Sequence, residues 1–206
     1  MSGFGTLRGH VAELRDALTS LEGQSDEIEQ WGARLARLYE ARGRLLAAGN
    51  GGSAAEAQHL TAELVGRFEG ERRPLSAIAL HAETSSVSAI GNDYGYDEVF
   101  ARQVEAHGRR GDVLLLLSTS GRSENLLVAA RRAAVTGLEV WALTGPPGNP
   151  LERLAHRCVA VDAPSTSAVQ EAQLVAVHAL CAALERHLPG ARRQAPLPRP
   201  DLVRLP

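Results

Sequence analysis

Lysine is absent from this chain of 206 residues, so every basic side chain is an arginine or a histidine. Its absence excludes Schiff-base catalysis, a lysine-bound pyridoxal cofactor and the lysine of a nucleotide-binding P-loop. An anion site built from uncharged hydroxyls and backbone N–H groups would suit such a chain.

Cysteines, long apolar runs and an excess of basic charge are also scarce or missing. The two cysteines make no disulfide framework, which predicts a reducing cytoplasm. The longest apolar run near the centre, 113–117, is far too short to cross a bilayer, and residues 1–22 are unlike a signal peptide. A net charge of −2 gives no basic footprint for nucleic acid. We therefore expect a cytoplasmic protein with no membrane or nucleic-acid partner.

The composition, 44% hydrophobic and 22% charged, fits a soluble domain with a substantial core. Residues 6–22 and about 26–42 show apolar positions at helical spacing. We interpret 1–43 as a helical hairpin within the same domain that makes oligomer contacts. Residues 189–206 hold several prolines and predict an extended or disordered tail.

From residue 45 the chain alternates between apolar runs and helical patterns. The apolar runs lie at 45–48, 77–80, 113–117, 138–143 and 158–161. Such runs indicate an α/β domain, here 44–188, whose parallel sheet is covered by helices on both faces. Because ligands bind at the carboxyl ends of parallel strands, the loops after the first and third strands are the candidate sites.

The loop after the first strand is rich in glycine and predicts an anion-binding turn. It consists of Gly49, Asn50, Gly51, Gly52 and Ser53, and we expect a helix to begin at Ala54. Glycines allow a tight turn with exposed N–H groups, and the helix N-terminus adds a partial positive charge. The natural guest is a phosphate group.

The loop after the third strand offers hydroxyls in the same position. Residues 118–123 read Ser-Thr-Ser-Gly-Arg-Ser, and a helix is expected to begin near Glu124. A single serine-rich turn is more often a helix cap than a ligand site. Two such loops on one sheet instead predict that Ser53 and the hydroxyls of Ser118, Thr119, Ser120 and Ser123 hold one phosphate from two sides.

A dinucleotide-binding loop is the rival interpretation, since Gly49, Gly51 and Ala54 match the G-x-G-x-x-A fingerprint. That fingerprint requires an acidic residue about twenty positions later, at the end of the second strand. The nearest acid beyond that strand is Glu83, some thirty residues past the glycines. This interpretation also leaves the loop at 118–123 without a role, so we favour a phosphate-binding site.

Two polar pairs on separate helices supply candidate chemistry. His59 and Glu63 are four residues apart on the helix after the first loop, and Gln170 and His178 are eight apart near the carboxyl end. Singly, each pair reads as a solvated contact or a core histidine. If the helices meet, the four side chains form a plausible zinc or other divalent site, or Glu63 and His178 transfer protons. The other five histidines receive no role.

Residues 91–97 read Gly-Asn-Asp-Tyr-Gly-Tyr-Asp and predict a polar turn after a short helical stretch. Asn92 and Asp93 could serve their own backbone or bind sugar hydroxyls. Their spacing leaves both roles open.

Taken together, these motifs resemble the sugar isomerase (SIS) domain of the phosphoheptose isomerase family over about residues 5–188. The resemblance rests on 49–53, Gln58-His59, Ala62-Glu63-Leu64, Gly66-Arg67, 91–95, 111–123, 143–145 and 170–178. It implies a flavodoxin-like five-stranded parallel sheet and conversion of sedoheptulose 7-phosphate to glycero-manno-heptose 7-phosphate, the first step toward nucleotide-activated heptose. It also implies a cytoplasmic homotetramer with active sites between subunits, and a zinc ion in some members.

The resemblance also assigns roles to residues. Glu63 and His178 match the acid/base pair, and His59, Glu63, Gln170 and His178 match the zinc ligands, one ion per subunit. Ser53, Ser118, Thr119, Ser120 and Ser123 match the phosphate-holding positions, and Asn50, Gly51, Gly52, Arg67, Asn92, Asp93 and Gln170 complete the expected substrate contacts.

This chain departs from the family where Arg-Ile usually precedes the Gln-Glu pair, because Ala168 and Val169 stand there. It also has Gln173 where a histidine is frequent. The alternative function is a non-catalytic SIS protein that binds a replication-initiator protein or senses a sugar phosphate. The initiator-binding relatives lack the counterparts of Glu63 and His178, and we expect no DNA-binding segment beside this domain, so the isomerase is favoured.

Overall fold

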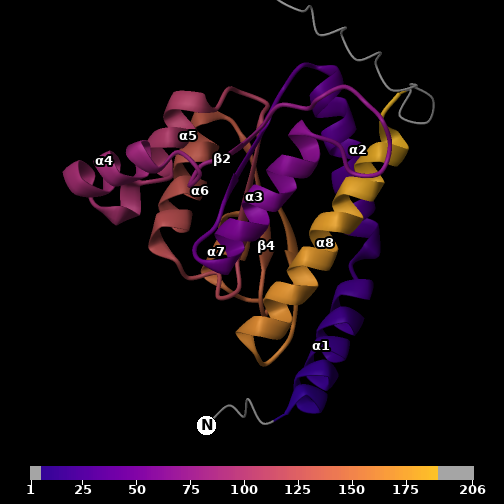
Figure 1. The fold of residues 1–206 in the computed structure, drawn as a ribbon. Coiled ribbons are helices and arrows are strands. Elements are labelled where there is room, and N and C mark those ends of the chain that lie inside the picture. Colours follow the sequence, from indigo (N-terminus) through magenta and orange to yellow (C-terminus); the bar gives the residue numbers. More distant parts are fainter. Residues whose placement is uncertain (1–5, 190–206) are drawn as a thin grey trace, which may run out of the picture.

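The computed structural model describes residues 6–189, which form a five-stranded parallel sheet between two layers of helices (Figure 1). The strands are β1 (Leu45–Ala48), β2 (Ala77–Ala79), β3 (Val113–Ser118), β4 (Glu139–Thr144) and β5 (Arg157–Ala160). They lie in the order β2-β1-β3-β4-β5, and every neighbouring pair is parallel. The predicted fold class is confirmed. The strands were recognisable because burial on both faces makes them continuously apolar.

The helices divide between the two faces of the sheet. One face carries α1 (Leu7–Glu22), α2 (Ser25–Glu40), α3 (Gly52–Val65) and α8 (Thr166–His187). The other carries α4 (Thr84–Tyr94), the 3₁₀ turn η1 (Tyr96–Glu98), α5 (Ala101–His107), α6 (Glu124–Thr136) and α7 (Pro150–Leu154). Alternate residues of β1 supply the two cores: Leu45 and Ala47 join the first, Leu46 and Ala48 the second.

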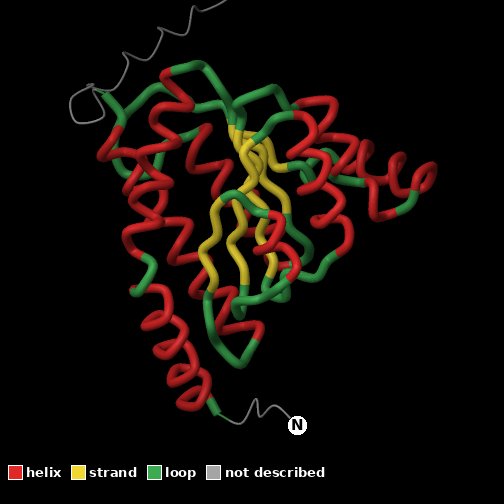
Figure 2. The backbone as a smooth tube through the Cα atoms, turned by 180° about the vertical axis from the view of Figure 1, so that it is seen from behind, coloured by secondary structure: helices red, strands yellow, loops and turns green. Residues whose placement is uncertain are grey.

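In place of the expected hairpin, α1 and α2 lie end to end, and both pack along α8 (Figures 1 and 2). The turn between them is two residues long and keeps negative φ, −62° at Gly23 and −114° at Gln24, so the chain continues forward. Gln24 is fixed to β5, because its side-chain oxygen accepts a hydrogen bond from the Ala160 N–H at 3.0 Å. The division at residues 43 and 188 stays a prediction, and the tail from 190 lies outside the described residues.

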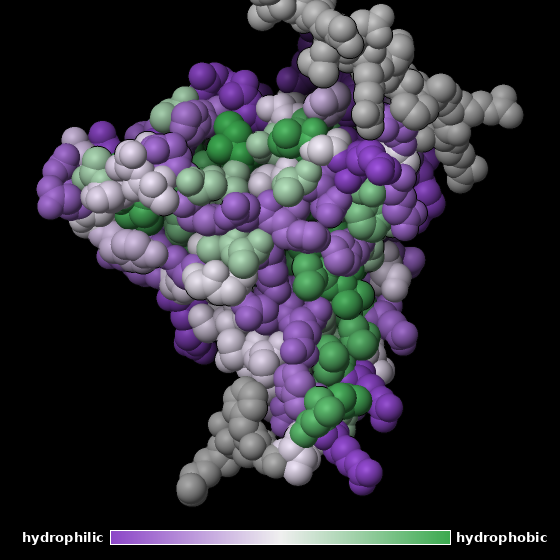
Figure 3. All heavy atoms as spheres, viewed as in Figure 1, coloured by the Kyte–Doolittle hydropathy of each residue, from purple (hydrophilic) through white to green (hydrophobic). Residues whose placement is uncertain are grey.

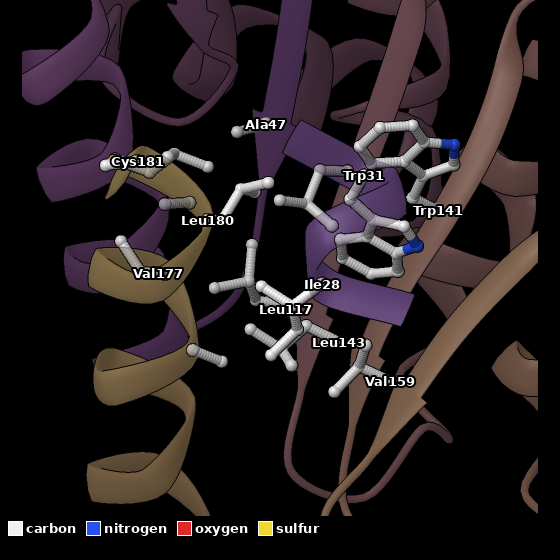
Figure 4. Close-up of a cluster of buried hydrophobic side chains, with 14 of the residues drawn as sticks. Ile28, Trp31, Ala47, Leu117, Trp141, Leu143, Val159, Val177, Leu180 and Cys181 are labelled. Atoms are coloured by element: carbon white, nitrogen blue, oxygen red, sulfur yellow. The ribbon is translucent and has the colours of Figure 1, made fainter. Parts of the chain in front are cut away.

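Two tryptophans lie at the centre of the core between the sheet and α2. Trp31 and Trp141 stack with ring centroids 4.7 Å apart, beside Leu143, Val159 and Leu180 (Figure 4). Of the helices in residues 6–189, α8 is the one long and apolar enough to cross a bilayer by composition, but 56% of its most apolar window is buried in this fold. Its apolar residues therefore serve the core.

Candidate functional site

The glycine loop connects β1 to α3 and is the first part of the site. Gly51 adopts φ +56° and precedes the helix, which begins at Gly52, two residues earlier than predicted. A side chain at Gly49 would come within 3.0 Å of the backbone of Ser53 and Ala54, so only glycine fits there. The buried Ser53 consequently sits in the first turn of α3, where unpaired N–H groups favour an anion.

The hydroxyl loop follows β3 and is the second part. Ser118 is buried, and its Oγ accepts a hydrogen bond from the Gly121 N–H at 3.0 Å. The Ser120 Oγ similarly accepts from the Arg122 N–H at 3.2 Å. Ser123 precedes α6 but makes no capping hydrogen bond with its side chain. The loop is therefore shaped by its own backbone, and α6 begins at Glu124 as predicted.

A pair of asparagines joins the two loops. Asn50 donates to the Asn125 Oδ1 at 3.0 Å, and Asn125 donates back to the Asn50 Oδ1 at 2.9 Å. The Tyr96 hydroxyl donates to the same Asn50 oxygen at 3.2 Å. Asn125 was not predicted as a site residue, although an amide in the first turn after a hydroxyl-rich loop is a signal in the sequence. Because β1 and β3 are neighbours, this pair sets the distance between the two loops.

A cavity of about 240 Å³ lies beside the hydroxyl loop. It is lined by Thr119, Ser120, Arg122 and residues 146–149, the loop after β4, which the sequence analysis did not assign to the site. The Asn149 amide is buried and donates to Thr144 Oγ1 at 3.1 Å, which holds that loop against the sheet.

The two polar pairs come together where α3 meets α8. The Nε2 atoms of His59 and His178 lie 2.9 Å apart, and the Glu63 Oε1 lies 3.4 Å from the same His59 nitrogen. The His178 ring stacks on Phe68 with centroids 5.7 Å apart. The condition set by the sequence, that the two helices meet, is therefore fulfilled. A carboxylate and two imidazoles that are connected through His59 can remove, store and return a proton.

Gln170 lies at the other end of the seam between α3 and α8. Its amide group packs against Gly52, where any side chain at position 52 would overlap it. Within residues 6–189, no three His, Cys, Asp or Glu residues are arranged to hold a metal ion. His59, Glu63 and His178 are nevertheless suitable zinc donors by type. Tetrahedral zinc would hold two ring nitrogens about 3.3 Å apart, slightly farther than they lie here.

Three predicted sugar contacts make hydrogen bonds outside this group. Asn92 and Asp93 belong to the last turn of α4, not to a free turn, because the helix continues until Gly95 with φ +89°. Their exposed side chains bond to each other at 2.8 Å. The exposed Arg67 donates to the Glu69 carbonyl at 3.4 Å. Their role at the sugar stays a prediction.

The rival dinucleotide interpretation receives no support from Glu83. Its carboxylate accepts hydrogen bonds from the Ser85 and Ser86 N–H groups and so caps α4. These bonds hold the pKa of Glu83 below its usual range. The Glu83 carboxylate thus serves as the N-cap of α4.

Glu56 is a buried acid that the sequence analysis missed. It lies on α3 seven residues before Glu63, within about 20° of the same direction around the helix. Its Oε2 has no hydrogen-bond partner among the described residues, and burial raises its pKa to about 8. Burial therefore favours the neutral form of Glu56.

Comparison with known proteins places this geometry in a family. Residues 10–145 match the model of the SIS domain. The chain is 61% identical over 188 residues to a phosphoheptose isomerase of Streptomyces coelicolor, covering 89% of this chain and 81% of that protein. It is 44% identical to one from Geobacter sp. (strain M21), covering 88% and 93%.

Two solved structures share the fold. A phosphoheptose isomerase from Francisella tularensis superposes with a TM-score of 0.81 at 30% identity, over 90% of this chain and all of that one. Phosphoheptose isomerase GmhA from Neisseria gonorrhoeae gives a TM-score of 0.80 at 38% identity, over 87% and 97%.

Proposed function

The chain belongs to the phosphoheptose isomerase family of SIS-domain proteins, and we propose from this premise how it carries out the family's reaction. The reaction converts sedoheptulose 7-phosphate into glycero-manno-heptose 7-phosphate. The observation that carries the proposal is that His59 contacts His178 across the seam between α3 and α8 and also contacts Glu63 on its own helix.

The chemistry moves one hydrogen between neighbouring carbons. The Glu63 carboxylate removes a proton from C1 of the ketose, and the electron pair forms the C1–C2 double bond of an enediol. His178 delivers a proton to the oxygen on C2 and takes the one on the C1 oxygen. Glu63 then returns its proton to C2, which leaves an aldehyde at C1. Atoms and charge balance, and both residues end as they began.

Substrate binding falls to the two loops. The phosphate lies between the N-terminus of α3 and the hydroxyl loop. Because the chain has no lysine, the phosphate is bound by N–H groups and by the hydroxyls of Ser53, Ser118, Thr119, Ser120 and Ser123. The asparagine pair fixes the distance between the loops, so the anchored ester places the sugar in one orientation. Asn50, Gly51, Gly52, Arg67, Asn92 and Asp93 would complete the sugar site.

We further propose one zinc ion per subunit, held by His59, Glu63, Gln170 and His178. When bound, zinc would polarise the sugar oxygens as a Lewis acid. Two imidazoles, a carboxylate and an amide oxygen are donors that zinc accepts, which supports the assignment. The amide of Gln170, which now packs against Gly52, would have to turn toward the histidines.

We propose that the protein is a cytoplasmic homotetramer. A stripe of apolar side chains runs over α8 and the start of α1 on the face shown in Figure 3, and Val175 on α8 is 45% exposed. The helix α4 buries none of its residues within the described chain. Apolar surface of this kind is typical of subunit contacts. The two cysteines and the composition support the cytoplasm.

Incubation with sedoheptulose 7-phosphate, followed by separation of the sugar phosphates, tests the function. We expect conversion to the aldose phosphate and exchange of the transferred hydrogen with deuterated solvent. A parallel incubation with a chelator, then with added zinc, tests the metal. If the protein binds the ketose phosphate without producing the aldose under either condition, it is a sugar-phosphate-binding protein and the isomerase proposal is wrong.

A further inference from the structure

Arg72 is a buried arginine in the loop after α3 that none of the chemistry above uses. Its side chain is only 4% exposed. We propose that Arg72 is a positioning residue, which together with Glu185 forms a latch that fixes Glu63 on α3 relative to His178 on α8. This inference rests on the proposed function, because it concerns the geometry of the same acid/base pair.

One side of the latch is the end of α3. The Arg72 Nη2 donates to the carbonyl of Glu63 at 2.5 Å, and its Nη1 donates to the carbonyl of Leu64 at 2.9 Å. A weaker bond reaches the Gly66 carbonyl at 3.5 Å. The last carbonyls of a helix lack partners within it and carry partial negative charge. The guanidinium therefore caps α3 at the residue that bears the base.

The other side of the latch is α8. The Arg72 Nε lies 3.3 Å from the Glu185 Oε1, and the other oxygen of Glu185 accepts a hydrogen bond from the Gly70 N–H at 3.0 Å. Glu185 is seven residues after His178, so both project from nearly the same side of α8. Through Arg72 the ion pair thus joins the end of α3 to α8, about 10 Å along α8 from His178. Figure 1 shows α3 lying alongside α8.

Loss of the latch should affect catalysis more than binding. Proton transfer depends on contacts such as the 3.4 Å between His59 and Glu63, and a displacement of about 1 Å can cost about 100-fold in rate. The phosphate site is at the other end of α3, where Ser53 is about 15 Å from Glu63 along the helix axis. A shift confined to the last turn of α3 would therefore lower kcat and leave KM nearly unchanged.

Steady-state kinetics of Arg72→Met, Arg72→Lys and the double variant Arg72→Met/Glu185→Leu tests the latch. The double variant leaves no unpaired buried charge, so it keeps a folded protein available for measurement. We expect kcat to fall about 10- to 100-fold in Arg72→Met and in the double variant, with KM within about twofold. Arg72→Lys should recover part of the loss, because its ammonium caps fewer carbonyls.

Arg157→Met is the matched control, since Arg157 pairs with Glu27 at 3.0 Å on α2, away from α3. It should keep kcat even if its melting temperature falls. All rates are measured well below each melting temperature. If Arg72→Met and the double variant keep the wild-type kcat, or if only KM changes, the latch proposal is overturned.

A measurement without turnover separates this proposal from the proposed function. The ¹⁵N chemical shifts of the His59 and His178 side chains report their mutual hydrogen bond. We expect these shifts to move in Arg72→Met and to stay constant in Arg157→Met. A wild-type protein inactive on sedoheptulose 7-phosphate would contradict the proposed function alone. Unchanged histidine shifts in Arg72→Met would overturn the latch alone.

Discussion

On one side α8 packs against α2 and the sheet through buried apolar residues, whereas on the other it meets α3 through histidine and glutamine. Leu180 and Ala183 on the first side are 3% and 0% exposed. On the second side His178 contacts His59, and the buried carboxyl of Glu56 on α3 has an oxygen with no partner among the described residues. Apolar burial stabilises a fold and unpaired polar burial costs stability. One helix thus supports the core and presents the chemistry, and its two sides should respond differently to mutation.

We expect the largest effect from Glu63→Gln, at the contact of α3 with α8. The amide cannot remove a proton from carbon, so we expect turnover of sedoheptulose 7-phosphate to fall about 10³- to 10⁴-fold. Binding of the phosphate ester and the melting temperature should stay close to wild type, because Gln keeps the shape of Glu. Initial rates and a binding titration provide the measurement. The same substitution at the exposed Glu105, which pairs with Arg132, is the control. Near-normal rates in Glu63→Gln would contradict the assignment of the base.

Trp31→Ala tests the other side of α8, where this helix packs against α2 and the sheet. Trp31 is 2% exposed and stacks on Trp141, so its removal leaves a large cavity. We expect the free energy of unfolding to fall by about 3 to 5 kcal/mol, as measured by urea denaturation. The activity of the folded fraction should change little. If kcat of the fully folded variant fell more than about tenfold, the two sides of α8 would not be separable.

Glu56→Gln tests the stability cost of the polar side. Burial raises the folded pKa of Glu56 from 4.5 to about 8, so folding becomes less favourable as the pH rises from about 4.5 to 8. The Gln variant lacks this titration and should match wild type near pH 4.5. By pH 8 it should be more stable by about 3 to 4 kcal/mol. Urea denaturation of both proteins across this range, compared as a difference, removes the contribution of the other groups. A difference independent of pH would contradict the buried neutral acid.

Particular residues show where sequence reasoning succeeded. The five strands were predicted to within a residue or two, because parallel strands buried on both faces are continuously apolar. The meeting of the helices that carry His59 and His178 was stated only as a condition of the site, and the structure fulfils it.

Other features depend on tertiary contacts that spacing does not encode. The collinear α1 and α2 follow from a two-residue turn that keeps negative φ, although glycine often ends a helix in the left-handed conformation. Asn125 and Arg72 act through partners 75 and 113 residues away, at Asn50 and Glu185. The sequence analysis assigned neither, because each partner is identified only once the chain is folded.

Gly52→Ala is the smallest change, because it adds one methyl group at the contact between α3 and α8. The new Cβ would overlap the Gln170 amide and displace it, whereas alanine itself favours the helix by up to about 1 kcal/mol. We therefore expect kcat/KM to fall about tenfold, equivalent to about 1.4 kcal/mol, while stability is kept. Gly9→Ala on α1 is the matched control, since among the described residues its Cβ would meet only the Thr6 hydroxyl, at 3.6 Å. Equal activity in the two variants would mean that Gln170 contributes nothing to the reaction, and the polar side of α8 would then act through His178 alone.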